Sequence, residues 1–217
     1  MENKTLTAEE VLAKYDRESD TRNVKGFMAK IITAIAISFS IFQLYTAIFG
    51  VLDAALQRAV HLGFGLVLIF LLYPTRRSWR RDKVHPFDFL LSIAGGAAPL
   101  YIVVFYEELV ARAASPTTLD MIVGVAGILI VLEAARRAVG WPMVIVACGF
   151  LTYAFAGPYM PPILAHRGLG IDELVDHIFF TTEGIFGIPL GVSSTFIFLF
   201  ILFGAYLETT GLGKFFI

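Results

Sequence analysis

Charged residues and cysteines are scarce in this sequence. Asp, Glu, Lys and Arg make up 16% of it, whereas about 25% is usual in soluble domains. The one cysteine, Cys148, has no partner for an intramolecular disulfide, and no set of Cys and His residues has the spacing of metal ligands. We therefore expect neither a disulfide framework nor a metal centre, and we interpret Cys148 as a small buried apolar side chain.

Catalytic motifs are also lacking. The sequence contains no nucleophile elbow, no phosphate-binding glycine loop, no HExxH pair and no pair of catalytic carboxylates. The net charge of −1 gives no reason to expect a nucleic-acid partner. An enzymatic function therefore has no residues to support it, and we expect no enzyme and no organic cofactor.

Long apolar segments are present in excess. The hydrophobic fraction is 57%, whereas soluble domains have roughly 45–50%. A membrane-spanning helix needs about 20 mostly apolar residues, and backbone groups in lipid must be satisfied within the segment, which makes such runs helical. The sequence thus predicts an all-α, polytopic membrane protein with six membrane segments, at residues 27–49, 56–73, 87–106, 119–139, 141–155 and 189–207. Within the first of these, we expect Ser38, Ser40 and Gln43 to face other helices.

Two segments outside these runs have a different character. Residues 1–26 are polar and charged, which predicts a tail in the cytoplasm. In residues 171–180, apolar side chains recur at helical spacing while Asp172, Glu173 and Asp176 fill the other face. This pattern predicts an amphipathic helix that lies at the membrane interface or against other helices and does not span the bilayer.

Lysine and arginine are distributed unevenly among the loops. If the N-terminus is cytoplasmic, only Arg58, Arg112 and Arg167 fall on the outer side. The positive-inside rule therefore places the N-terminus in the cytoplasm, and six spans return the C-terminal end to the same side. Glu133 precedes Arg136 and Arg137 by three and four residues, which predicts an intrahelical ion pair at this boundary. We interpret the cluster at residues 76–81, RRSWRR, as a topology anchor, with a lipid-headgroup site as the secondary interpretation.

The segment GIPLGVSST is the first candidate functional site. Its glycines and proline interrupt regular helix, and transporters use the exposed backbone of broken helices to bind ions and substrate. Hydroxyl groups follow the interruption directly. The candidate substrate- or ion-binding residues are Gly187, Pro189, Ser193, Ser194 and Thr195. The alternative is an ordinary helix start with a proline in its first turn.

Arg58 and His61 form a second candidate. They are three residues apart near the outer end of the second apolar run. Polar groups within a membrane are costly and often functional. The alternative is structural, because an arginine near the interface extends its charge towards water and a histidine packs among other helices.

Three stretches resemble a known family. They are RAVHLGFGLVLIFLLYP at residues 58–74, the RRSWRR loop, and TTEGIFGIPLGVSSTFIFLFILFGAYLETTGLGKFFI at residues 181–217. These look like the fused permease subunits of tripartite ATP-independent periplasmic (TRAP) transporters. The similarity is closest to the TAXI-type branch, in which the small and large membrane subunits form one polypeptide.

The resemblance implies secondary active import of organic anions, commonly carboxylates, across the bacterial inner membrane. A sodium gradient would drive it, and a soluble periplasmic protein would deliver the substrate. Residues 27–139 would match the small-subunit-like domain of four helices, and residues 140–217 would match the start of the large transport subunit. Such permeases are several times longer, so we expect an N-terminal fragment that works with the remainder of the permease. We carry over no binding residue from the family.

A function of another class remains open. The chain would then be a non-transporting membrane adaptor or scaffold that binds a partner through its tail. The interruption at residues 184–191 favours the transporter, because an adaptor has no need of a broken helix.

Overall fold

The computed structural model describes residues 21–76, 82–113 and 115–212. All regular elements in these ranges are helices, and six helical stretches are long and apolar enough to cross a membrane. Their bounds are Phe27–Phe49, Ala54–Leu72, Pro86–Val104, Thr118–Ala138, Trp141–Tyr159 and Ile188–Thr209. The predicted all-α class with six membrane segments is confirmed. Most of the predicted tail (1–20), most of the RRSWRR loop (77–81) and the chain end (213–217) lie outside the described residues.

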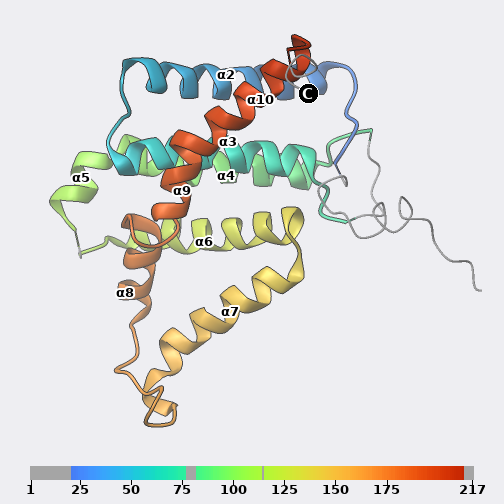
Figure 1. Cartoon of the computed structure of the whole chain (residues 1–217). Coiled ribbons are helices and arrows are strands. Elements are labelled where there is room, and N and C mark those ends of the chain that lie inside the picture. Colours follow the sequence, from blue (N-terminus) through green and yellow to red (C-terminus); the bar gives the residue numbers. More distant parts are fainter. Residues whose placement is uncertain (1–20, 77–81, 114, 213–217) are drawn as a thin grey trace, which may run out of the picture.

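Four long helices lie side by side and alternate in direction (Figure 1). They are α2 (Phe27–Phe49), α3 (Ala54–Leu72), α4 (Pro86–Val104) and α6 (Thr118–Ala138). The helix after α4 is α5 (Tyr106–Ala111), and α7 (Trp141–Ala156) continues into η1 (Gly157–Tyr159). The C-terminal part contains α8 (Ile171–Val175), η2 (Asp176–Phe180), α9 (Ile188–Val192), η3 (Ser193–Ile197) and α10 (Phe198–Thr209). This part runs across the four-helix layer and contacts α6, α3 and α2 in turn.

Close packing of α3 against α4 forms the centre of the layer. A Cβ atom added at Gly95 would lie 3.0 Å from the ring of Phe70, and one added at Gly96 would lie 2.9 Å from Val67. Small residues let the two helix backbones approach in this way. Phe70 is completely buried here, in a cluster with Leu66 and residues of α6.

Side chains of the C-terminal part complete the core. Phe179 of η2 and Phe186 of the following turn are buried against Ala59, Ala98 and Ile102. Their rings meet edge to face, with centroids 5.5 Å apart. The C-terminal part is therefore anchored in the four-helix layer by aromatic packing.

The amphipathic helix is confirmed over residues 171–180, as α8 continued by the π-helical η2. Ten residues extend about 15 Å along a helix, half of the roughly 30 Å of a bilayer's hydrocarbon core, so this helix is too short to span. Its apolar face packs on α6 at Gly124 and Gly127. Its location at a membrane interface stays a prediction.

Two expectations about exposure are wrong. Cys148 is exposed, and its helix α7 has no buried residue. Ser38 is also exposed, and its hydroxyl donates to Ala34 of its own helix, 2.9 Å away. Ser40 likewise bonds within α2, whereas Gln43 is buried against other helices, as expected.

The loop expected after the third apolar run is partly helical. That span ends at Val104, and Glu107 and Glu108 lie in the first turn of α5. Carboxylates are favourable in the first turn because they interact with the positive end of the helix dipole.

Basic residues gather at one end of the layer. Arg22, Arg136 and Arg137 meet there, where α3 and α6 end and α4 begins. Arg58 and Arg112 lie at the opposite end, with the start of α3 and the end of α5. The predicted ion pairs of Glu133 with Arg136 and Arg137 are confirmed, with N–O distances of 2.7 and 2.8 Å. The two ends of the layer therefore differ in their basic residues, and the positive-inside rule uses this difference to orient a membrane protein. Which end faces the cytoplasm stays a prediction.

Candidate functional site

The helix is interrupted between Phe180 and Ile188, and π-helical turns lie on both sides of the interruption. η2 precedes it and η3 follows it. π-Helical turns are rare and occur frequently at functional sites. The interruption is a compact turn in which the amide of Ile185 donates to the carbonyl of Ile178 at 2.9 Å. Gly184 is required there, because an added Cβ would overlap the backbone of Ile178.

Gly187 and Pro189 form the start of the last span. Gly187 caps α9, and Pro189 occupies its first turn, where a backbone N–H would have no helical partner. The helical stretch Ile188–Thr209 is 22 residues long. The interruption therefore precedes a full-length span. The local geometry of Gly187 and Pro189 is that of an ordinary helix start with a proline in its first turn, the alternative given for this segment.

Five polar side chains and the backbone carbonyl of Ser194 connect η3 to α2 and α3, and we call this group the polar junction. Its members are Gln43, Thr46, Gln57, His61, Ser193 and Ser194. The amide nitrogen of Gln57 lies 3.1 Å from Oε1 of Gln43, 3.2 Å from the hydroxyl of Thr46 and 3.2 Å from the carbonyl oxygen of Ser194. Most of the junction is nearly inaccessible, and Gln57 and Ser194 are each 2% exposed.

The junction sets the orientation of His61. Its Nδ1 lies 2.5 Å from the amide nitrogen of Gln43, and its Nε2 lies 3.2 Å from the hydroxyl of Ser193. Since the Gln43 amide donates, Nδ1 accepts, and a neutral imidazole then carries its proton on Nε2 and donates to Ser193. Interhelical hydrogen bonds in membranes contribute about 0.6 kcal/mol each on average. Several of them together fix η3 on the helices of the layer.

Arg58 contacts the same segment from the outer end of α3. Its Nη1 donates to the carbonyl of Phe186 at 2.6 Å. Its guanidinium also packs on Gly191, where an added Cβ would lie 2.8 Å from Nε. The structure thus brings both candidate groups together, because Arg58 and His61 contact the segment that holds Gly187 to Thr195. The hydroxyls of Ser194 and Thr195 are engaged within that segment and donate to the carbonyl of Gly191.

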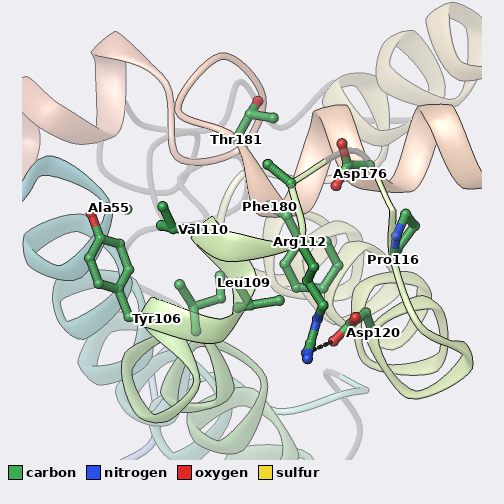
Figure 2. Close-up of a pocket in the computed structure, with 12 residues that line it drawn as sticks. Ala55, Tyr106, Leu109, Val110, Arg112, Pro116, Asp120, Asp176, Phe180 and Thr181 are labelled. Carbon is green, nitrogen blue, oxygen red and sulfur yellow. Dashed lines mark hydrogen bonds and ion pairs between the residues drawn. The ribbon is translucent and has the colours of Figure 1, made fainter.

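A cavity lies beside Phe180, where the interruption begins (Figure 2). It has a volume of about 180 Å³ and is lined by α5, the start of α6 and η2. Arg112 pairs with Asp120 at 2.9 Å, and the hydroxyl of Tyr101 donates to the same carboxylate at 2.6 Å. Thr117 and Asp120 form a capping box at the start of α6, which was not predicted. The ion pair to Arg112 depends on the fold of α5 and was not predicted.

Asp176 of η2 also lines this cavity. Burial raises the pKa of Asp176, the positive charge of His177 opposes this, and the negative charge of Asp120 adds to the increase. The carboxyl is therefore more easily protonated in the folded chain than in the unfolded chain. Its contribution to stability is present below the unfolded pKa and is lost as the pH rises through the folded pKa.

The variant Asp176→Asn should therefore gain thermal stability at alkaline pH. Relative to the native chain, we expect its unfolding midpoint to be about 1–2 °C higher at pH 8, a fraction of a kcal/mol for a chain of this size. At pH 3 the two chains should agree. Thermal unfolding in detergent across this range tests the prediction, with Asp172→Asn on the exposed side of the same helix as the charge control. Equal midpoints of Asp176→Asn and the native chain at pH 8 would contradict it.

Residues 126–217 match the family model of the "Tripartite ATP-independent periplasmic transporter, DctM component". Neither the curated proteins nor the solved structures gave a match. The matched region begins within α6 and contains the interruption, both π-helical turns and the last two spans. The resemblance that the sequence shows at residues 181–217 is thereby confirmed, and a transporter family agrees with the expectation of a protein that is not an enzyme. Over residues 126–217, this multi-pass membrane protein is similar to the DctM component of TRAP transporters.

Proposed function

We propose that the chain is the permease component of a secondary active, sodium-coupled TRAP importer of organic anions such as carboxylates. The observation that carries this proposal is the family match, which covers the interrupted helix and the spans around it. In this role the protein would work with other TRAP components in a lipid bilayer. Its partners would be a periplasmic substrate-binding protein and the remainder of the permease.

We also propose the TAXI-type arrangement, with small- and large-subunit-like parts in one polypeptide. The chain supports it because α2, α3 and α4 precede the matched region and pack as one layer with α6. The predicted boundary at residues 139–140 coincides with the turn between α6 and α7. In this arrangement the four-helix layer is the fixed part, and the polar junction holds η3 on it.

The proposed location is the bacterial inner membrane with the N-terminus in the cytoplasm. Its support is the gathering of basic residues at the end of the layer that holds Arg22 and Arg137. Positive charge of this kind is retained on the cytoplasmic side.

For the ion or substrate ligands we keep the residues Gly187, Pro189, Ser193, Ser194 and Thr195. Their support is the π-helical turn η3, where the hydroxyls and carbonyls of three of them lie beside a buried polar junction. An ion would have to replace the hydrogen bonds that now join these hydroxyls to Gly191 and His61.

An adaptor or scaffold without transport is the alternative. The polar junction suits it, because an internally bonded set of side chains fixes helices without any ligand. The family match favours the permease, since it covers the region that an adaptor would not need.

Transport by the full-length reading frame that contains this chain tests the proposal. In vesicles with a sodium gradient and the periplasmic binding protein, it should accumulate a carboxylate, whereas the 217-residue chain should show no uptake. In that full-length protein, the double variant Ser193→Ala/Ser194→Ala should raise the sodium concentration for half-maximal uptake about three- to tenfold. This is the scale of one or two lost hydrogen bonds.

The control is Ser38→Ala, which removes an exposed hydroxyl of α2 that bonds only within its helix. Sodium dependence of this variant should equal that of the native protein. Unchanged sodium dependence in the double variant would remove the proposed ion ligands, and no sodium-driven uptake by the full-length protein would remove the proposed function.

A further inference from the structure

Arg58 differs from the other arginines whose contacts the structure describes. Arg22, Arg112, Arg136, Arg137 and Arg167 each pair with a carboxylate. Among the described residues, no carboxylate pairs with Arg58, and its contact is the carbonyl oxygen of Phe186. A carbonyl satisfies one N–H donor and leaves the positive charge without a counter-ion. Arg58 is half-buried, and a charge that is partly withdrawn from water without a counter-ion is costly, so an anion would stabilise it.

A cavity of about 300 Å³ adjoins this guanidinium. Gln57, Ser194 and Thr195 line it together with Arg58. Nε and Nη2 of Arg58 lie beside Gly191, which also lines the cavity and has no side chain to cover them. A guanidinium has five N–H donors in a planar fork that suits an oxyanion. The donors that Phe186 leaves free are therefore available on the cavity side.

The mouth of the cavity is apolar. Its exposed side chains are Val51, Leu52, Ile188, Val192 and Phe196. Ile188 is 77% exposed and Phe196 is 65% exposed, and both belong to a membrane-spanning helix. An anion from water would have to pass this apolar surface. A phospholipid places an oxyanion and acyl chains next to each other, which matches a cationic cavity with an apolar mouth.

The depth of Arg58 agrees with a lipid headgroup. It lies four residues after the first residue of α3, which corresponds to about 6 Å along the helix. This is close to the end of the span, where arginine side chains reach the boundary between hydrocarbon and headgroups.

We propose that Arg58 binds the phosphate oxyanion of a membrane phospholipid whose acyl chains lie against the apolar mouth of this cavity. The same guanidinium then holds the turn before α9 through Phe186 and the lipid through its remaining donors. A bound lipid thereby stabilises the start of the last span. The site does not depend on the proposed transport function.

Lipid-dependent stability of the 217-residue chain in detergent tests this proposal. Thermal unfolding and native mass spectrometry would be recorded with dioleoylphosphatidylglycerol, with dioleoylglycerol, which has the same chains without phosphate, and with inorganic phosphate. Phosphatidylglycerol should raise the unfolding midpoint of the native chain and remain bound in the mass spectrum. Dioleoylglycerol and inorganic phosphate should not reproduce this effect.

The variant Arg58→Gln should weaken the apparent lipid affinity about ten- to a hundredfold, the scale of a charge-assisted hydrogen bond. Its control is Arg167→Gln, which removes an exposed arginine paired with Glu173 and should keep the native affinity. Gly191→Ala retains the charge but displaces the guanidinium, and should also weaken binding. If Arg58→Gln does not fold, the lipid affinity of Gly191→Ala tests the proposal in its place.

Native lipid affinity in Arg58→Gln or Gly191→Ala would overturn the proposal. A full effect of inorganic phosphate would show a site for free oxyanions instead of a lipid site. A full effect of dioleoylglycerol would show that the acyl chains alone bind, and no lipid effect on the native chain would remove the site.

Discussion

The variant Asp88→Asn should lower the midpoint of thermal unfolding by about 6–20 °C. Asp88 lies between Arg22 and Arg137, and the side chains of all three are completely buried. Removing one partner of a buried ion pair costs about 3–5 kcal/mol because the remaining charge is uncompensated. In a chain of this size each kcal/mol shifts the midpoint by about 2–4 °C.

The geometry around Asp88 explains why no other group can replace it. Its carboxylate accepts from Arg137 at 2.8 Å and from the hydroxyl of Thr75 at 2.5 Å, and it pairs with Arg22. Arg137 also donates to the carbonyl of Tyr73 and to Glu133. The start of α4 is thereby joined to the ends of α3 and α6, so a neutral residue at position 88 loosens three helices together.

Two further variants separate the charge effect from a general loss of packing. Glu133→Gln should cost less, because Glu133 is 26% exposed and Arg137 keeps its pair with Asp88. The double variant Asp88→Asn/Arg22→Gln should recover part of the loss, since it removes Arg22, which loses its carboxylate partner, whereas Arg137 keeps its pair with Glu133. Thermal unfolding in detergent measures all three. A midpoint for Asp88→Asn within about 2 °C of the native value would show that the cluster does not hold the helices together.

The spans could be predicted from sequence because their signal is local. Length and apolarity are properties of a single segment, and the bounds of 27–49 agree with α2 at both ends. Interruptions are also local, since Pro74 and the glycines at 184–191 act on their own backbone. The helix over 171–180 was predictable for the same reason, because its apolar face repeats within ten residues.

The partners of intramembrane polar groups could not be predicted in this way. The sequence shows that Gln43 and His61 lie in apolar runs, but not that they meet, because this depends on the rotation of α2 against α3. Gln43 and His61 are 18 residues apart in the sequence, whereas Arg22 and Asp88 are 66 residues apart. Exposure of α7 was missed because apolar side chains in a membrane protein also face lipid or other subunits, so apolarity alone does not predict burial. Cys148 shows this error directly.

The variant Gly127→Ala should destabilise the chain although alanine is the better helix former. An added Cβ at Gly127 would overlap the ring of Phe179, and Phe179 is completely buried. Its ring is held edge to face against Phe180 and Phe186. Overpacking a filled core costs about 1–3 kcal/mol, which corresponds to a midpoint lower by about 2–12 °C.

Gly149→Ala is the matched control, because it makes the same change inside a helix where nothing lies within 4 Å of the added Cβ. Replacing glycine by alanine in an open helix position stabilises by about 0.8–1.0 kcal/mol, so this variant should unfold at a higher temperature than the native chain. The two substitutions should therefore shift the midpoint in opposite directions. A lowered midpoint in both would point to a general intolerance of added methyl groups and would remove the specific role of Gly127.

The location of the damage in Gly127→Ala should also be specific. The overlap pushes η2 away from α6, and η2 leads directly into the turn that Arg58 holds through Phe186. Hydrogen exchange should therefore increase most over residues 171–187 and much less in α3 and α4, which also pack directly on each other at Gly95 and Gly96. Adding Phe179→Leu removes the ring edge that the new methyl group meets, so the double variant should regain protection in that segment. If exchange in Gly127→Ala rises equally across α3, α4 and η2, the amphipathic helix is not a separately anchored element, and its packing on α6 does not position the interruption.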